Sequence, residues 1–124
     1  MNTILVVDDR PDARYALVRT LSGAGYDVRE TATGRDALRL ARLAPDLIVL
    51  DIALQDIDGF EVCRRLKMDA VTSGIPVVQK TAVFRDEEHR RRGLDAGADE
   101  YLTEPFEPQL LVDTVKRLLA RRGN

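Results

Sequence analysis

Four consecutive apolar residues, Leu47 to Leu50, stand between two acids, Asp46 and Asp51. The run is too short for a helix and has no alternating polar face, which is typical of a strand buried on both sides in a parallel sheet. Ligands of such sheets bind beyond the carboxyl ends of the strands, and Asp51 stands at one of these ends. The run therefore predicts a parallel sheet with a binding site next to Asp51.

A second strand, predicted over residues 3–8, also ends in acids, which are Asp8 and Asp9. Two carboxylates at neighbouring strand ends repel each other by about 4 kcal/mol at about 4 Å and an effective dielectric constant of about 20. A positive charge has to compensate this repulsion, and a hard divalent cation such as Mg2+ suits oxygen ligands. The strand ends therefore predict a Mg2+ site formed by Asp8, Asp9 and Asp51.

Strand and helix patterns alternate five times, at a spacing of about 20–25 residues. This order predicts an α/β fold in which five helices cover both faces of a doubly wound, five-stranded parallel sheet. The length of 124 residues suggests one domain over residues 1–124. The second strand, residues 26–31, is polar and is expected near a sheet edge.

Three boundaries depend on weaker signals. The apolar face of the second helix is expected to include Ala44, with Pro45 ending the helix. The fourth strand is expected to begin at residue 75, and Gln79 and Lys80 interrupt its apolar run. Residues 121–124 are expected to form a frayed end or the start of a linker.

Composition excludes several classes of protein. The net charge is −2, so no overall basic field recruits nucleic acid or a membrane surface. No apolar run approaches the length of a membrane span, and Met1-Asn2-Thr3 is expected to lead into the first strand rather than into a signal peptide. Cys63 is the one cysteine, which excludes an internal disulfide and fits a reducing, cytoplasmic location. Its helical pattern favours a place in the core over a redox role.

Eight mostly charged residues, Arg85 to Arg92, precede Leu94. If helical, this stretch has almost no apolar stripe, so it is expected to pack weakly and to be among the more mobile elements. It is interpreted either as a solvated face or as a movable partner surface. His89, the lone histidine, is expected to be an exposed surface residue.

Four motifs stand in order along the chain: Val6-Val7-Asp8-Asp9, the segment from Asp51 to Phe60, Thr81-Ala82, and Tyr101-Leu102-Thr103-Glu104-Pro105-Phe106. Their order and spacing resemble bacterial response-regulator receiver domains over essentially the whole chain. Each motif is weak alone, but four in register are highly specific. The resemblance implies a flavodoxin-like three-layer α/β/α sandwich with strand order 2-1-3-4-5.

The resemblance also implies roles for the acids. Asp51 resembles the phosphoacceptor, which takes a phosphoryl group from a histidine kinase, a phosphotransfer domain or a small phosphodonor. Asp8 and Asp9 resemble the Mg2+-binding acids, and the backbone carbonyl of Ala53 resembles a further metal contact. The alternative for Asp8 and Asp9 is that they only favour the start of the following helix.

Two further residues resemble the family's switch. Thr81 resembles the hydroxyl residue that moves to the phosphoryl group, and Tyr101 the aromatic residue that then turns inward. The alternatives are that Thr81 is only a turn residue and that Tyr101 is a core residue that does not switch. The surface formed by residues 85–120 would carry the change to a partner or to a second copy of the chain.

The family's usual lysine before the proline is here Glu104. A glutamate facing inward would leave four carboxylates without a nearby cation, whereas one facing water would cost little. We hypothesise that Lys80 supplies the missing charge by pairing with Glu104. Because alternation places Lys80 opposite Thr81, Lys80 would have to curl over the strand end; the alternative is that it reaches solvent. Pro105 is expected to follow a cis bond.

Two functions follow from these residues. One is a phosphoacceptor receiver domain in a two-component phosphorelay, which is not an enzyme beyond assisting its own phosphorylation and dephosphorylation. The other is a receiver-derived interaction module in which Glu104 has ended phosphorylation. A flavodoxin or an aspartyl-phosphate hydrolase fits poorly, because the loop after the first strand is acidic and no Asp-x-Asp pair follows a strand. The Glu-Pro pairs at 104–105 and 107–108 resemble receivers of hybrid histidine kinases.

Overall fold

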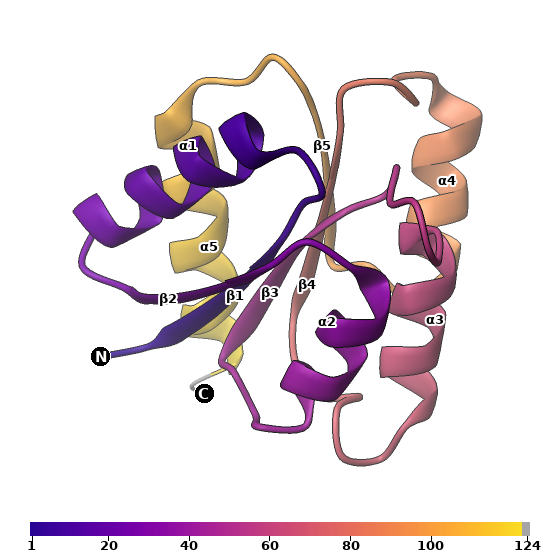
Figure 1. Cartoon of the computed structure of the whole chain (residues 1–124), viewed down its shortest axis with the longest axis horizontal. Coiled ribbons are helices and arrows are strands. Elements are labelled where there is room, and N and C mark those ends of the chain that lie inside the picture. The colour runs from indigo at the N-terminus through magenta and orange to yellow at the C-terminus, as the bar shows by residue number, and fades with distance from the viewer. Residues whose placement is uncertain (123–124) are drawn as a thin grey trace.

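The computed structural model describes residues 1–122, in which five strands alternate with five helices (Figure 1). All strand pairs are parallel, and the strand order is β2-β1-β3-β4-β5. The predicted parallel sheet and the predicted strand order are thereby confirmed, and the polar strand β2 lies at an edge of the sheet as expected. The elements are β1 (Thr3–Val7), α1 (Pro11–Gly23), β2 (Asp27–Thr31), α2 (Gly34–Ala41), β3 (Leu47–Asp51), α3 (Gly59–Met68), β4 (Val77–Thr81), α4 (Glu87–Asp95), β5 (Glu100–Thr103) and α5 (Pro108–Arg122).

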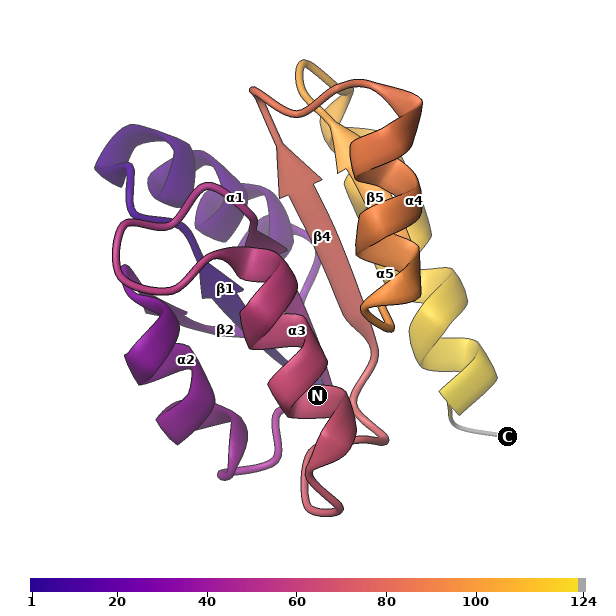
Figure 2. The same cartoon turned by 90° about the vertical axis from the view of Figure 1, so that its right-hand side faces the viewer.

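Helices cover both faces of the sheet, as expected for a doubly wound fold. Alternate strand residues such as Ile4 and Val49 pack with α1 and α5, whereas Leu5 and Ile48 pack with α2 and α3. Figure 2 looks onto the second face, where α2, α3 and α4 lie in front of the sheet. Every residue of β3 is buried, because this central strand has neighbours on both edges and helices on both faces.

The register of the sheet brings four residues into one row at its carboxyl edge. Asp51 of β3 pairs with Lys80 of β4, and Lys80 pairs with Leu102 of β5. Continuing the β1–β3 register by one residue places Asp8 beside Asp51. Because side chains alternate, all four belong to the face that packs against α1 and α5.

Three of the predicted boundaries were wrong. Strand β4 begins at Val77 rather than at residue 75, because Pro76 has no N–H to donate to a neighbouring strand. It continues through Gln79 and Lys80, both of which are buried. Helix α2 ends at Ala41, and Ala44 has a positive φ of 60° in the following turn. Helix α5 continues through Arg122, whose guanidinium donates to the backbone carbonyl of Asp46 at 2.8 Å. Residues 123–124 of the expected frayed end lie outside the described residues.

Helix α4 has the weak packing expected from its charged sequence. Among its residues only Gly93 is buried, and Leu94 is 39% exposed rather than anchoring the helix. A Cβ atom at Gly93 would lie 2.7 Å from Cδ1 of Tyr101, so the glycine allows close approach to β5. Within residues 1–122, no helix combines the length and the apolar character that crossing a membrane requires.

Cys63 lies in the core between α3 and the sheet, and burial raises the pKa of its thiol to about 11. A thiol pKa that is raised by about two units lowers the fraction of thiolate at a given pH by about 100-fold. We therefore expect 5,5′-dithiobis(2-nitrobenzoic acid) to modify the native protein at least about 100-fold more slowly than the urea-unfolded chain at about pH 8. Equal rates would contradict this core position.

Candidate functional site: an acidic cluster with a buried lysine

Asp8, Asp9 and Asp51 gather at the carboxyl edge of the sheet, as their strand ends predict. One ligand atom of each carboxylate lies within 4.8 Å of the others, and Asp8 and Asp51 are buried. Asp51 ends β3, whereas Asp8 and Asp9 directly follow β1. The adjacent central strands deliver the three acids because a parallel sheet aligns its carboxyl ends.

Backbone donors of the edge loops fix two of these carboxylates. The N–H of Arg10 donates to Asp8 Oδ1 at 3.0 Å, and the N–H of Ala53 donates to Asp51 Oδ1 at 3.2 Å. The start of α3 also reaches the site, since the N–H of Gly59 donates to the carbonyl of Ile52 at 2.9 Å. The acids are therefore held at fixed positions before any ligand arrives.

The environment of Asp51 disfavours its negative charge. Burial raises the pKa of this carboxyl to about 6, and the charges of Asp8 and Asp9 act in the same direction. Attraction to Lys80 and the hydrogen bond from Ala53 oppose the rise without cancelling it. A cation bound here would relieve this repulsion, and three carboxylates are the oxygen donors that Mg2+ prefers.

Lys80 supplies a cation to this cluster. Its side chain is 1% exposed, and Nζ donates to Asp8 Oδ2 at 2.6 Å and to Glu104 Oε1. Burial alone lowers the pKa of Lys80, but the hydrogen bonds to Asp8 and Glu104 raise it above the ordinary value. The pairing with Glu104 is confirmed, and the alternative that Lys80 reaches solvent is wrong.

The expected route of Lys80 was also wrong. The side chain does not have to curl over the strand end, because Lys80 already shares one face of the sheet with Asp8 and Asp51. Thr81 is the residue that faces the other side. In the described structure the ammonium contacts Asp8 rather than Asp51.

Glu104 lies between two cations. Its side chain is 25% exposed, and Oε2 accepts from Arg10 Nη2 at 3.4 Å while Oε1 accepts from Lys80. It turns neither fully to water nor into a site without cations; the third expectation, pairing with Lys80, describes its position. The bond between Glu104 and Pro105 is cis, as expected.

Thr81 and Tyr101 are connected through one residue of the loop after β4. The buried hydroxyl of Thr81 accepts from the N–H groups of Val83 and Phe84, at 3.0 and 2.9 Å. The hydroxyl of Tyr101 donates to the carbonyl of Phe84 at 2.7 Å, and its ring is buried against Ile52. Burial raises the pKa of Tyr101 to about 12. In this arrangement Thr81 holds the turn after β4 and Tyr101 packs in the core. These contacts match the alternative roles given for the two residues, a turn residue and a core residue.

An aromatic stack attaches α4 to the site and was missed from the sequence. The ring of His89 stacks on Phe84 with centroids 4.5 Å apart, and its Nδ1 lies 2.5 Å from Asp86 Oδ1. Arg92 lies over the ring of Phe60, 4.5 Å from its centroid. His89 is thus half-buried rather than freely exposed. In the sequence, the one indication of this contact was that His89 follows Phe84 by five residues.

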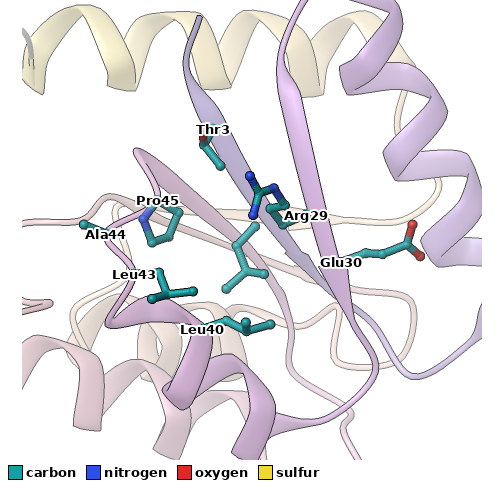
Figure 3. A pocket seen from close by; sticks show the side chains of 8 residues that line it. Thr3, Arg29, Glu30, Leu40, Leu43, Ala44 and Pro45 are labelled. Atoms are coloured by element: carbon teal, nitrogen blue, oxygen red, sulfur yellow. The ribbon is translucent and has the colours of Figure 1, made fainter.

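A hollow of about 270 Å3 lies at the other end of the sheet, next to the edge strand β2 (Figure 3). It is lined by Leu40, Leu43 and Pro45 on one side and by Arg29 and Thr3 on the other. Thr3 begins β1, whereas Asp8 follows the opposite end of that strand. The hollow is therefore separate from the acidic cluster.

Comparison with known proteins gives a match to a family along most of the chain. The model of the response regulator receiver domain matches residues 4–116. The DNA-binding dual master transcriptional regulator RpaA of Synechocystis is 42% identical over 122 residues, which cover 98% of this chain and 50% of that protein. The phosphate regulon transcriptional regulatory protein PhoB of Pseudomonas aeruginosa is 40% identical, with 98% and 53% covered. The chain spans about half the length of these relatives.

Solved structures show the same likeness in three dimensions. The signal receiver domain of a signal transduction histidine kinase from Syntrophus aciditrophicus has a TM-score of 0.88 and 35% identity. The match covers 97% of this chain and 91% of that one. The likeness therefore extends over nearly the whole fold.

Proposed function

The chain belongs to the response-regulator receiver family, and from this premise we propose that it accepts a phosphoryl group on Asp51 in two-component signalling. The donor is a phosphohistidine of a histidine kinase or phosphotransfer domain, or a small phosphodonor. The observation that carries the proposal is the group of three carboxylates at adjacent strand ends, two of which, Asp8 and Asp51, are buried. Activities of the longer relatives, including DNA binding, are not assumed for this chain.

The reaction is a phosphoryl transfer to a carboxylate. An oxygen of ionised Asp51 forms a bond to phosphorus while the bond from phosphorus to the donor imidazole nitrogen breaks. The electron pair of that bond stays on the imidazole, which takes up a proton from water. The protein contributes mainly position and charge stabilisation, since little covalent chemistry is required of it.

Asp8, Asp9 and Asp51 would hold Mg2+, with the carbonyl of Ala53 as a further contact. Their oxygen donors fit this ion, and burial together with their mutual repulsion raises the pKa of Asp51. When bound, Mg2+ neutralises charge on the transferring phosphoryl oxygens. The chain itself contributes the N–H of Ala53, which fixes one oxygen of Asp51 and leaves the other for attack.

The link through Phe84 supports a route from Asp51 to the surface. A Thr81 hydroxyl that turns toward a phosphoryl group gives up two N–H groups of the loop, one of them from Phe84. The same residue accepts from Tyr101 and stacks on His89. Movement of this loop would therefore be transmitted to α4, the weakly packed helix on the surface.

Incubation with acetyl phosphate and Mg2+ tests the phosphoacceptor. We expect the intact mass to increase by one phosphoryl group in the wild type and in Asp56→Asn, but not in Asp51→Asn. Asp56 is a matched control because it is an acid of the neighbouring loop that accepts from the backbone of Gly34 and Arg35 instead. Modification of Asp51→Asn to the wild-type extent would assign the phosphoryl group to another residue.

The second candidate is an interaction module that works without phosphorylation. It is favoured by the acid at position 104 and by the pairing of Lys80 with Asp8, which occupies a proposed metal ligand. A wild-type protein that binds no Mg2+ and acquires no phosphoryl group would support this candidate. Labelling of the wild type on Asp51 would reject it.

A further inference from the structure

The ammonium of Lys80 occupies a defined place at the carboxyl edge. It projects from β4, the strand next to Asp51, and its side chain lies on the same face as Asp8 and Asp51. The position is fixed by the sheet register, not by a surface loop. A buried lysine at this place is surrounded by acids from three strand ends, those that follow β1, β3 and β5.

The ammonium has unused capacity to donate. A lysine carries three N–H donors, and in the described structure two of them are taken by Asp8 and Glu104. The third is taken by neither of these carboxylates, and Asp8, which Lys80 contacts, has a ligand atom within 4.8 Å of one of Asp51. An ammonium with a spare donor is thus held beside the carboxylate that neighbours Asp51.

Glu104 complements this arrangement. It holds the Lys80 ammonium together with Asp8, and Arg10 in turn holds the second oxygen of Glu104 at 3.4 Å. The side chain of Arg10 is about half exposed, so its contribution is modest. Without Glu104, the ammonium would have one anchoring carboxylate and a wider range of positions.

We propose that Lys80 is the residue that donates to the phosphoryl oxygens on Asp51, and that Glu104 is a positioning residue that holds its ammonium there. The cation comes from β4 instead of from the residue after β5, and Glu104 adds one negative charge beside it. This inference rests on the proposed function of Asp51. It predicts that Lys80 and Glu104 act as one unit and that the glutamate does not inactivate the site.

The test compares double variants in which Lys80 and Glu104 are changed together, so that Glu104 does not lose its cation while it keeps its charge. Lys80→Val with Glu104→Gln removes the ammonium, and valine suits a buried strand position beside apolar neighbours. Lys80→Val with Glu104→Lys restores one ammonium from β5. The single variant Lys67→Gln is the control. Lys67 is a partly buried lysine that donates to the backbone carbonyl of Ile75 and to the carboxylate of Asp99, outside the cluster of Asp8, Asp9 and Asp51.

Three quantities are measured for each variant: the phosphorylation rate with acetyl phosphate at saturating Mg2+, the Mg2+ dissociation constant by titration calorimetry, and the unfolding temperature. The Lys80→Val, Glu104→Gln variant should be phosphorylated about 100-fold more slowly, as when one preorganised donor is lost. Its Mg2+ dissociation constant should fall by about tenfold, because the ammonium no longer competes for Asp8. A general structural defect would weaken both properties together.

The Lys80→Val, Glu104→Lys variant should recover a rate within about tenfold of the wild type, and Lys67→Gln should change only the unfolding temperature. Wild-type rates in the variant without the ammonium would overturn the role of Lys80 while leaving Asp51 as the phosphoacceptor. A wild type that acquires no phosphoryl group would remove the proposed function and this inference together. If the first double variant does not fold, single Lys80→Gln replaces it with the same expected results.

Discussion

Asparagine in place of Asp51 should increase the free energy of unfolding of the metal-free protein by about 3 kcal/mol at about pH 7.5. The reason is the raised pKa of this carboxyl, about 6 in the folded protein against a model value of 3.8. Burial disfavours the carboxylate, and a neutral amide avoids this cost. An asparagine oxygen can still accept from the N–H of Ala53. Urea unfolding followed by circular dichroism measures the difference.

The sign of the pH dependence follows from the same pKa. Below about pH 3.8 the Asp51 carboxyl is neutral in both states, so Asp51 and asparagine are equivalent. Between this value and about pH 6 the folded protein retains a proton that the unfolded chain has released, and wild-type stability falls as the pH rises. The advantage of Asp51→Asn should thus grow from about pH 4 to about pH 7.

Two controls make this prediction specific. Asp56→Asn should have the opposite sign, because hydrogen bonds from Gly34 and Arg35 lower the pKa of Asp56 even though its desolvation acts the other way. Saturating Mg2+ should narrow the gap between Asp51→Asn and the wild type, since a ligand stabilises the form that binds it. Equal stability of the wild type and Asp51→Asn between about pH 5 and pH 8 would contradict the raised pKa of Asp51.

Gly59→Ala should destabilise the protein by about 2–3 kcal/mol, in the range found when a packed region must accept extra atoms. A Cβ atom at Gly59 would lie 2.5 Å from the carbonyl oxygen of Asp51 and 2.5 Å from the Cα of Ile52. Both are backbone atoms, so relief requires β3 and the start of α3 to move apart. Thermal and urea unfolding measure the loss, and acetyl phosphate labelling should also be slower.

Gly23→Ala is the matched control, because Gly23 also belongs to a helix but has no heavy atom within 4 Å of an added Cβ. Alanine at this position should stabilise the protein by about 0.5–1 kcal/mol, since it reduces the entropy of the unfolded chain. Similar effects of the two substitutions would show that the contact with β3 does not set the cost at Gly59.

Much of the fold could be predicted because it depends on local patterns. The apolar run before Asp51 indicates a central strand, and the polar sequence of β2 indicates an edge, since burial decides which side chains a strand tolerates. The burial of Gln79 and Lys80 could not be predicted in this way. They interrupt the apolar run of β4, and only their neighbours in the folded sheet explain why these polar residues are buried.

The sequence by itself determined which acids meet. Asp8 and Asp51 each follow a strand, and parallel pairing brings such ends to one edge whatever the loops do. Only the tertiary structure decided where Lys80 and Glu104 place their charges. Alternation assigns Lys80 to a face, but the strand register and the torsions of a long side chain decide whether its ammonium reaches solvent or Asp8. Contacts between strands distant in sequence fix that choice, and a one-dimensional pattern contains no record of them.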